Sequence, residues 1–384
     1  MGPLARRVLH VMRMSGVGGS ENHLRVLLPE LRELGWEPDV LIPSPSPPAI
    51  SGLTESFSQS CRRVTVAPMR ADISPSLPVR IARLLRSGEY QIVHSHLVHA
   101  DWYVAVASVA APGVALVSTK HNDDRFRRTY PFRVIERVMS NRCAATITIS
   151  EALRDFTLRY SPPRTPLATV LYGLEAPPGA PERGSESDSP TLLAVARLVR
   201  QKGLDILIHA MRPIKESVPD ARLLLAGDGP ERRALERLAR KLGVADSVSF
   251  LGHREDVEHL MRRAWILAHP SRWEGFGLVL LEAMKQGLPI VAARVSAVPE
   301  IVIPEATGLL VPPEDPRALA EAAIRALGDE RFRRDAGMRG FERLVEHFSA
   351  ERMARETAAI YDRCVFSDRG VRRGPRDDGR LEGI

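Results

Sequence analysis

The chain of 384 residues exceeds what one hydrophobic core usually supports, and its 44% hydrophobic and 26% charged residues exclude a fibrous or largely disordered protein. Its three cysteines are far apart and odd in number, which excludes a fully paired disulfide framework and a zinc motif made of cysteine alone. The net charge of +7 favours anionic partners such as phosphates, acidic lipids or nucleic acid.

The N-terminus passes from two arginines directly into a short strand, without an apolar run of signal-peptide length. The most apolar stretch, residues 102–117, is interrupted by Pro112 and Gly113, so neither half is long enough to cross a bilayer. We therefore expect a cytoplasmic protein that is either soluble or peripheral on the inner face of the membrane.

Short runs rich in β-branched residues alternate with helical patterns along the whole chain, which is typical of βαβ units and parallel sheets. In the first half, the pattern predicts strands at 7–12, 38–43, 63–68, 91–96, 114–121, 145–150 and 168–173. It predicts helices between them at 21–35, 77–88, 100–111, 130–141 and 151–160. A second series of strands is predicted at 191–198, 221–227, 247–252, 265–271, 289–294 and 307–313.

These two series predict an α/β protein with two Rossmann-like, doubly wound domains. Residues 1–172 would form the N-terminal domain and residues 191–348 the C-terminal domain. Residues 173–190, rich in Pro, Gly, Ser and acids, read as the linker. A final helix at about 349–364 is expected to pack back on the first domain, and the mixed-charge tail 365–384 is expected to be disordered.

Candidate binding residues follow the strands, because ligands of open α/β sheets lie beyond the carboxyl ends of strands. In "PSRWEGFGLVLLEAMKQG", Gly275 and Gly277 leave backbone N–H groups free at a helix start, where an anion is favoured. Glu282 is the one carboxylate within the apolar helix that follows, so it needs a hydrogen-bond donor such as a ribose diol. Arg197 and Lys202 follow another strand and make a plausible diphosphate clamp.

Three glycine turns complete this set. Gly18 and Gly19 in "RMSGVGGSE" permit close approach of backbone to a phosphate at the start of the first long helix. Gly227 in "LAGDGPE" and the turn in "FLGHRED" end two neighbouring strands of the second half.

Together these motifs resemble the retaining GT-B glycosyltransferases of family GT4. The resemblance rests on Glu274 and Glu282, separated by seven residues in "EGFGLVLLEA", and on "ARLVRQKGLDILI", "LAGDGPE" and "FLGHRED". It runs from about residue 8 to residue 362, and in the first half "GGSE", "VHSH" and "STKHN" match in kind and order. The fold it implies is GT-B, with the two domains facing a central cleft. One departure is "VLYGLE", where Tyr172 replaces a residue that usually turns the chain.

The resemblance implies a role for each candidate. Arg197 and Lys202 would hold the donor diphosphate, Glu282 the ribose, and Glu274 a hydroxyl of the transferred sugar. Gly18 and Gly19 would close over the phosphates, and the amides near Phe276, Gly277 and Leu278 would bind phosphate or sugar. The stretch around His253 and Arg254 would meet the nucleobase, and Gly227 and Gly275 would belong to the same donor site. His96 would lie near the reacting sugar, with His99 and His121 on the acceptor side.

The implied reaction moves a sugar from a nucleotide diphosphate sugar to an acceptor hydroxyl, with retention at the anomeric carbon. Arginine, lysine and helix-end amides would supply the positive charge, so no divalent metal, no other cofactor and no protein nucleophile is expected. The expected acceptor is a glycan or a lipid-linked precursor of a polysaccharide or glycoconjugate.

Three other classes of function fit the motifs less well. A nicotinamide dehydrogenase needs G-x-G-x-x-G directly after the first strand, which "MSGVGGSE" lacks. A nucleotide-sugar epimerase of the same architecture would not be expected to carry the glutamate pair, and a non-catalytic glycan-binding relative would be expected to have lost a cation or a glutamate.

Two surface and metal readings also stay open. His94 and His96 lie on one face of a strand and suit zinc, but the sequence fixes no third ligand. The basic and aromatic stretch 120–142 suits either an anionic membrane surface or an ordinary solvated face. Nucleic acid is disfavoured because no reader motif accompanies the charge.

Overall fold

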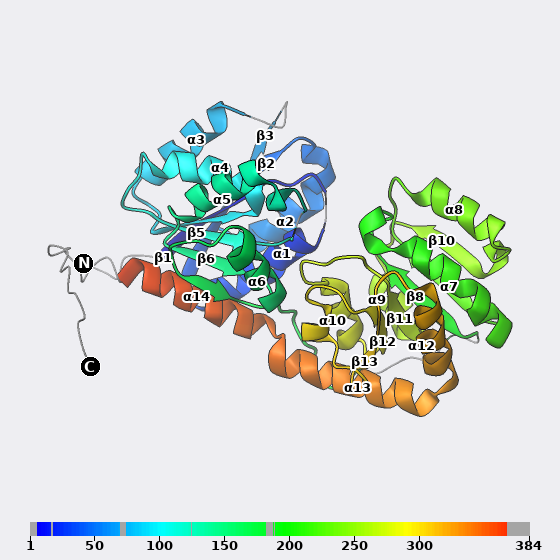
Figure 1. Cartoon of the computed structure of the whole chain (residues 1–384). Helices are drawn as coiled ribbons and strands as arrows, with labels where there is room; N and C mark the ends of the chain where they lie inside the picture. The colour runs from blue at the N-terminus through cyan, green and yellow to red at the C-terminus, as the bar shows by residue number, and fades with distance from the viewer. Residues whose placement is uncertain are drawn as a thin grey trace, which may run out of the picture.

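The computed structural model describes residues 6–16, 18–69, 74–123, 125–181, 187 and 189–366. Within them the chain forms two parallel sheets, each with helices on both faces (Figure 1). The expected disordered tail lies outside the described residues from residue 367 onward, as does part of the expected linker.

The first sheet has the strand order β3-β2-β1-β4-β5-β6-β7. All of its pairs are parallel, and helices cover both faces, so its central strands are almost wholly apolar or buried. Its strands are β1 (Arg6–Met12), β2 (Trp36–Ser44), β3 (Arg63–Pro68), β4 (Ile92–His96), β5 (Ala115–Lys120), β6 (Ala145–Thr148) and β7 (Leu167–Thr169).

The helices of this domain differ from the expected set at one place. Residues 51–60 form α2, which sequence reasoning missed because only Leu53 and Phe57 mark its buried face among serines and other polar residues. The helices are α1 (Gly19–Glu33), α2 (Ser51–Ser60), α3 (Ser76–Arg86), α4 (Leu97–Ser108), α5 (Tyr130–Ser140) and α6 (Glu151–Tyr160), with short 3-10 turns η1 (Pro47–Ile50) and η2 (Arg125–Arg128).

The second sheet has the order β10-β9-β8-β11-β12-β13, again all parallel. Its strands are β8 (Thr191–Val195), β9 (Arg222–Ala226), β10 (Val248–Gly252), β11 (Ile266–His269), β12 (Ile290–Ala293) and β13 (Gly308–Val311). The helices are α7 (Leu204–Ser217), α8 (Arg232–Lys241), α9 (Val257–Arg263), α10 (Leu278–Lys285), α11 (Val298–Ile301), α12 (Pro316–Gly328) and α13 (Glu330–His347), with η3 (Arg200–Lys202) and η4 (Ala245–Ser247).

The chain passes between the domains twice, and the two passages touch. Leu174 forms a parallel bridge with Ser349, and a Cβ on Gly173 would lie only 2.2 Å from the Ser349 carbonyl oxygen. The last helix, α14 (Ala350–Phe366), then runs along the first domain against α1 (Figure 1). Its Tyr361 is fully buried, with its ring 5.0 Å from Trp36.

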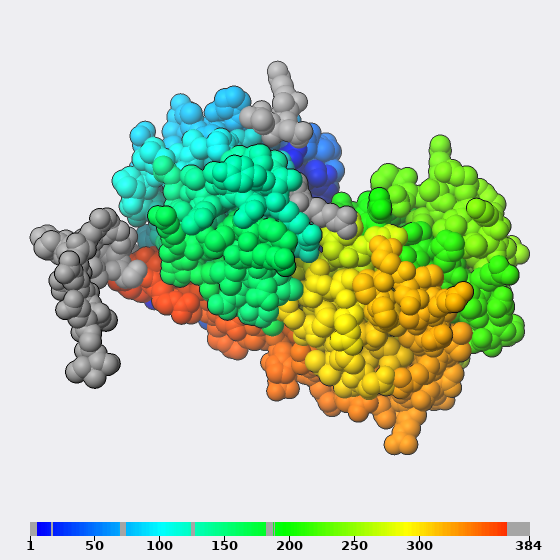
Figure 2. Space-filling view, viewed as in Figure 1, coloured from blue at the N-terminus to red at the C-terminus, as the bar shows by residue number. Residues whose placement is uncertain are grey.

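Apolar packing continues from one domain to the other at the base of the molecule. Tyr172, Phe276 and Phe348 belong to one buried cluster, with ring centroids 5.2 Å apart for the first pair and 6.1 Å for the second. In the space-filling view the two domains touch in the lower part of the molecule and separate above it in a notch (Figure 2). The contact therefore leaves the carboxyl-end loops of both sheets facing each other.

Candidate active site between the two domains

Two helix N-termini meet at the domain boundary. Gly18 caps α1 of the first domain, and Gly277 caps α10 of the second with φ of +102°, a left-handed conformation that glycine adopts without strain. A Cβ on Gly19 would lie 3.8 Å from Leu278, so the two helix starts are in contact distance. Helix starts favour an anion, and at the start of α1 the Glu21 carboxylate already accepts from backbone N–H groups of the turn and from Ser20 at 2.9 Å.

Two cations stand beside these helix starts. Arg197 follows β8 and is exposed, and its charge acts on Glu21 of α1 across the boundary. Lys202 ends the 3-10 turn η3, with 18% of its side chain exposed. The fold thus brings the expected diphosphate cations next to the expected glycine turns.

Glu274 is 6% exposed and lies in the loop between β11 and α10 of the second domain, which we call the donor loop. One of its oxygens, Oε1, is 2.5 Å from Lys202 Nζ, accepts a bond of 2.7 Å from Ser271, and lies 3.0 Å from His269 Nε2. Burial alone would raise the pKa of Glu274, but Lys202 and His269 outweigh it and hold that pKa well below its ordinary value. Glu274 is therefore ionised, and its second oxygen has no hydrogen-bond partner among the described residues.

The loop that carries Glu274 is fastened to the loop that carries Lys202. Gln201 donates to the Trp273 carbonyl at 3.0 Å, and Arg272 forms two bonds of 2.8 Å with Asp205. Gly203 has φ of +61°, and a Cβ there would lie 2.1 Å from the Pro270 carbonyl oxygen. Only a glycine fits this close approach, so the cation and the acid are held as one rigid unit.

Glu282 lies on α10, about one turn in from its start, and is half-buried. Burial raises its pKa, and the nearby charges of Arg25 and Lys285 oppose that shift only in part. Among the described residues no side chain donates a hydrogen bond to this carboxylate. Its predicted contact with a ribose therefore stays a prediction.

Gly227, His253 and Arg254 lie together at the ends of β9 and β10. Gly227 has φ of +131°, and a Cβ there would lie 2.0 Å from the Ala196 carbonyl oxygen, one residue before Arg197. His253 and Arg254 are exposed, and Arg254 is held by Asp256 through bonds of 2.7 and 2.6 Å. Gly227 therefore lies beside the segment that carries Arg197.

The first-domain histidines are arranged differently from the expectation. His96 is fully buried, and both of its ring nitrogens are used, by His10 and by His121, at 3.0 Å each. It is therefore closed off from the cleft, and its expected contact with the reacting sugar is not available in this conformation. His121 lies nearer the donor loop, because a Cβ on Gly275 would lie 2.2 Å from the His121 carbonyl oxygen. His99 is exposed on α4.

The fold does supply a third histidine beside the pair that suggested zinc. His10, His94 and His96 each offer a nitrogen within 4.8 Å of the others. His94 is hydrogen-bonded to Tyr361 at 2.6 Å and to Thr119 at 2.7 Å, so a metal ion would have to displace existing bonds. No carboxylate or thiolate among the described residues joins these three ligands, and two of the three rings already bond to each other, so the set reads as a hydrogen-bonded cluster.

Sequence reasoning missed several polar residues of the site. Glu21, in the turn "GGSE", lies over the glycine turn, 2.9 Å from where a Cβ of Gly18 would be. His269 and Ser271 at the end of β11 hold Glu274. Ser296 joins the Glu274 backbone to Asp123 of the first domain at 3.3 and 3.2 Å. Their spacing in sequence carried no signal, except that Glu21 and His269 stand next to the motifs quoted above.

Comparison with known proteins identifies the fold and the family. A family model of glycosyl transferases group 1 matches residues 180–343, and a model of glycosyltransferase family 4 matches residues 17–175. Two doubly wound parallel domains with this order of strands place the chain in the GT-B class of fold.

Individual relatives identify the family. D-inositol 3-phosphate glycosyltransferase of Corynebacterium efficiens is 30% identical over 322 residues, which cover 76% of this chain and 75% of that protein. N-acetyl-alpha-D-glucosaminyl L-malate synthase of Bacillus anthracis is 34% identical over 180 residues, and in that match the chain spans about half the relative's length, 47%. The chain belongs to glycosyltransferase family 4.

Among solved structures, HepE of Anabaena in complex with UDP and glucose superposes with a TM-score of 0.79. It is 21% identical, and the match covers 93% of this chain and 99% of that one. At this identity the likeness concerns the fold.

Proposed function

We propose that the protein transfers a glycosyl unit from a nucleotide diphosphate sugar to an acceptor hydroxyl, with retention at the anomeric carbon. The observation that carries this proposal is the meeting of Arg197 and Lys202 with the N-termini of α1 and α10. Two cations and two helix starts then converge on one place, which suits a diphosphate that takes over the backbone N–H groups now bonded to Glu21. The UDP and UDP-glucose bound to the solved Anabaena relative support the same class of donor.

The main task in this reaction is to stabilise charge that develops on the departing diphosphate. Cations and amides that are fixed before the reaction do so without reorganising. The ammonium of Lys202 has three N–H donors, and the Glu274 pair uses one, so two remain for phosphate oxygens. The free oxygen of Glu274 would accept from a hydroxyl of the transferred sugar, and Glu282 from the ribose.

The same charges make a divalent metal unnecessary at the donor site in this proposal. An acceptor that attacks from the side of the leaving group can pass its proton to a phosphate oxygen, so no protein nucleophile is required. Retention is the stereochemical result of that geometry. Comparing the anomeric configuration of donor and product by proton NMR, with a chelator present throughout, tests both parts together.

For the acceptor we propose a lipid-linked glycan precursor met at an anionic membrane surface. The helices α4 and α5 lie side by side and expose a face that we call the α4–α5 face: Trp102, Val106, Tyr130, Val134 and Val138. Exposed charges on the described part of 97–142 are all arginines, since Asp101 and Glu136 are buried and Asp123 is half-buried. Apolar and cationic groups together favour anionic lipid.

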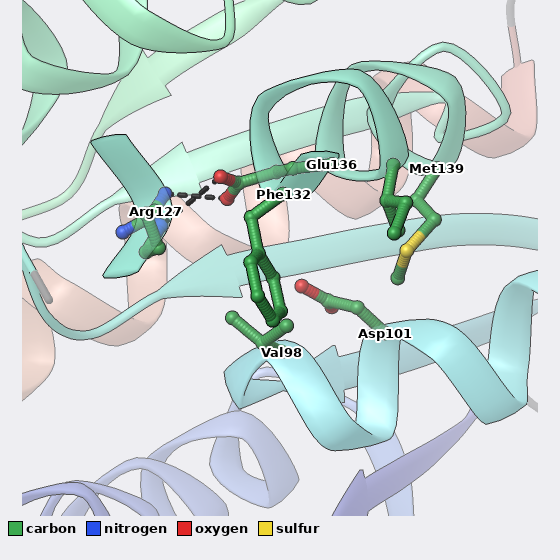
Figure 3. Close-up of a pocket in the computed structure, with 7 residues that line it drawn as sticks. Val98, Asp101, Arg127, Phe132, Glu136 and Met139 are labelled. Atoms are coloured by element: carbon green, nitrogen blue, oxygen red, sulfur yellow. Dashed lines mark hydrogen bonds and ion pairs between the residues drawn. The ribbon is translucent and has the colours of Figure 1, made fainter. Parts of the chain in front are cut away.

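A small pocket opens between these two helices (Figure 3). Val98, Phe132 and Met139 form its apolar wall, and an ion pair of 2.5 Å between Arg127 and Glu136 closes one side. Asp101, which also lines the pocket, is paired with Lys120 at 2.6 Å. The ion pairs of Glu136 with Arg127 and Lys120 attach α5 to the rest of the domain. The apolar side chains Val134 and Val138 of the same helix stay exposed. In the described part of the chain, no helix combines the length and hydropathy that crossing a bilayer requires.

The donor is tested by thermal shift with UDP-, GDP- and ADP-sugars. The proposal expects one base to raise the melting temperature by several degrees without added metal, since a ligand at 100 times its Kd adds about 2.7 kcal/mol. If no nucleotide sugar changes the melting temperature, while turnover with a sugar phosphate or an activated lipid donor is found, the donor assignment is wrong.

A further inference from the structure

Tyr172 contacts three segments that border the candidate site. It is 3% exposed at the point where the chain leaves the first domain. Its ring stacks on His23 of α1, with centroids 4.4 Å apart, and lies 5.2 Å from Phe276 of the donor loop. Its hydroxyl is hydrogen-bonded to His121 Nδ1. One side chain thus touches the helix after the glycine turn, the end of β5, and the loop between Glu274 and α10.

The hydroxyl begins a chain of hydrogen bonds through three buried histidines. His121 Nε2 lies 3.0 Å from His96 Nδ1, and His96 Nε2 lies 3.0 Å from His10 Nδ1. Burial lowers the pKa of all three imidazoles, to about 3 for His10 and His121, so they are neutral at pH 7. Each neutral ring has one N–H donor and one acceptor nitrogen. All hydrogen bonds of the series must therefore be donated in the same direction, either toward Tyr172 or toward His10.

Counting unpartnered groups decides the direction. If the N–H groups pointed toward Tyr172, its hydroxyl hydrogen and the lone pair of His10 Nε2 would both be buried without a partner among the described residues. If the Tyr172 O–H is the first donor of the series instead, only the Nε2–H group of His10 lacks a hydrogen-bond partner among the described residues. Buried polar groups without partners are costly, so the second direction is favoured.

We propose that Tyr172 is a positioning residue of the transfer site: its hydroxyl donates to His121 and fixes the Nε2–H tautomer and orientation of that ring, while its ring seats Phe276 and so the donor loop. The proposal rests on the proposed function only for its effect on turnover. It also gives a role to Tyr172, the departure from the family pattern in "VLYGLE", because its long side chain contacts His23, His121 and Phe276 together.

The tautomers test the proposal directly on the unaltered protein. Nitrogen NMR of protein labelled with ¹⁵N-histidine at pH 7 is expected to show Nε2–H and an unprotonated Nδ1 for His121, His96 and His10. A wild-type His121 that carries its proton on Nδ1 would overturn the proposal. This readout needs no substrate, so it stands even where the proposed donor proves wrong.

The variant Tyr172→Phe keeps the ring and removes only the O–H. Its expected effect is a fall in kcat of about tenfold with donor KM within twofold, because the reacting groups shift while the ground-state donor contacts remain. The matched control is Tyr361→Phe, which removes a buried phenol bonded to His94 in the same cluster but away from the donor loop. Its kcat should stay within twofold of wild type.

Two results would contradict this role in turnover. One is a Tyr172→Phe variant with wild-type kcat. The other is an equal loss of kcat in both variants, which would mean that the hydroxyls only stabilise the histidine cluster as a whole. Melting temperatures of both variants, measured alongside, separate a loss of fold from a loss of rate, and the wild-type tautomers decide the matter should Tyr172→Phe not fold.

Discussion

Lys202 and Glu274 form a pair whose charges are buried and complementary. Their side chains are 18% and 6% exposed and 2.5 Å apart. Such a pair adds little net stability over an apolar pair, but removing one partner leaves an uncompensated buried charge. The pair therefore serves to hold a cation and an acid at fixed places in the cleft, which matters for binding a phosphate and a sugar hydroxyl at the same time.

The variant Lys202→Met should lower the free energy of unfolding at pH 7 by about 1–3 kcal/mol, less than a full unpairing costs, because Ser271 and His269 still contact the Glu274 carboxylate. Lys202 holds the pKa of Glu274 below its unfolded value, so wild-type stability from this group is lost as the pH falls below about 4.5. In Lys202→Met the pKa of Glu274 should be higher than in wild type. The difference in free energy of unfolding between the two proteins should therefore become smaller as the pH falls. Urea titrations measure this difference in free energy of unfolding. If it stays the same from pH 7 to pH 4, the pairing is contradicted.

Glu282 should behave in the opposite way. Its pKa is raised by burial, so its charge costs stability increasingly as the pH rises through that pKa. Glu282→Gln should therefore leave the melting temperature unchanged or raise it by about 1–3 °C at pH 7, and should abolish the shift caused by the nucleotide sugar. A variant that melts lower and still responds to the donor would show that Glu282 is structural.

At the scale of elements, the donor loop is held against the end of β5 by a glycine. A methyl group at Gly275 would lie 2.2 Å from the His121 carbonyl oxygen, so one of the two segments must move. We expect Gly275→Ala to raise donor KM about tenfold and lower stability by about 1–3 kcal/mol. The control is Gly179→Ala, where nothing lies within 4 Å. Equal kinetics for the two variants would mean that the loop does not need this contact.

The α4–α5 face offers a second test at the same scale. Val134 and Val138 are 45% and 58% exposed, and changing both to Ser should weaken binding to vesicles of anionic lipid about tenfold. The matched control changes Met338 and Val345 of α13, which are 39% and 46% exposed on the second domain. Vesicle flotation assays that show the same loss for both pairs, or none for either, would rule out this face as the membrane contact.

At the scale of the molecule, five buried histidines make the first domain sensitive to acid: His10, His23, His94, His96 and His121. Burial depresses their pKa values below the unfolded value of about 6.5. The unfolded chain therefore binds more protons, and stability should be full above pH 6.5 and fall as the pH drops toward about 3.

That acid sensitivity can be reduced at one residue. His23 Nδ1 is buried without a partner among the described residues, and the ring stacks on Tyr172, so His23→Phe keeps the stack and removes a proton acceptor. Between pH 6 and 4 the variant should lose up to about 1.4 kcal/mol less per pH unit than wild type. Identical slopes in denaturant titrations would show that His23 is not neutral in the folded state.

Much of this architecture is predictable from the amino-acid sequence. The order of strands follows from β-branched runs, and the position of Arg197, Lys202 and Glu274 just after strands marks them as candidate ligand contacts. The pairing of Lys202 with Glu274 is not predictable, since 72 residues separate them and only the sheet order brings their loops together. The hydrogen-bonded series from Tyr172 to His10 joins the middle of β1, the ends of β4 and β5, and a domain crossing, which no local pattern encodes.

The central claim is that an outgoing diphosphate is held between Arg197 and Lys202 on one side and the starts of α1 and α10 on the other. The most direct measurement is a crystal structure with the nucleoside diphosphate that gives the largest thermal shift. The account predicts phosphate oxygens within about 3 Å of Lys202 Nζ and of the Arg197 guanidinium, near the Gly18–Gly19 turn. A diphosphate bound elsewhere, with these cations still facing only protein, would contradict it.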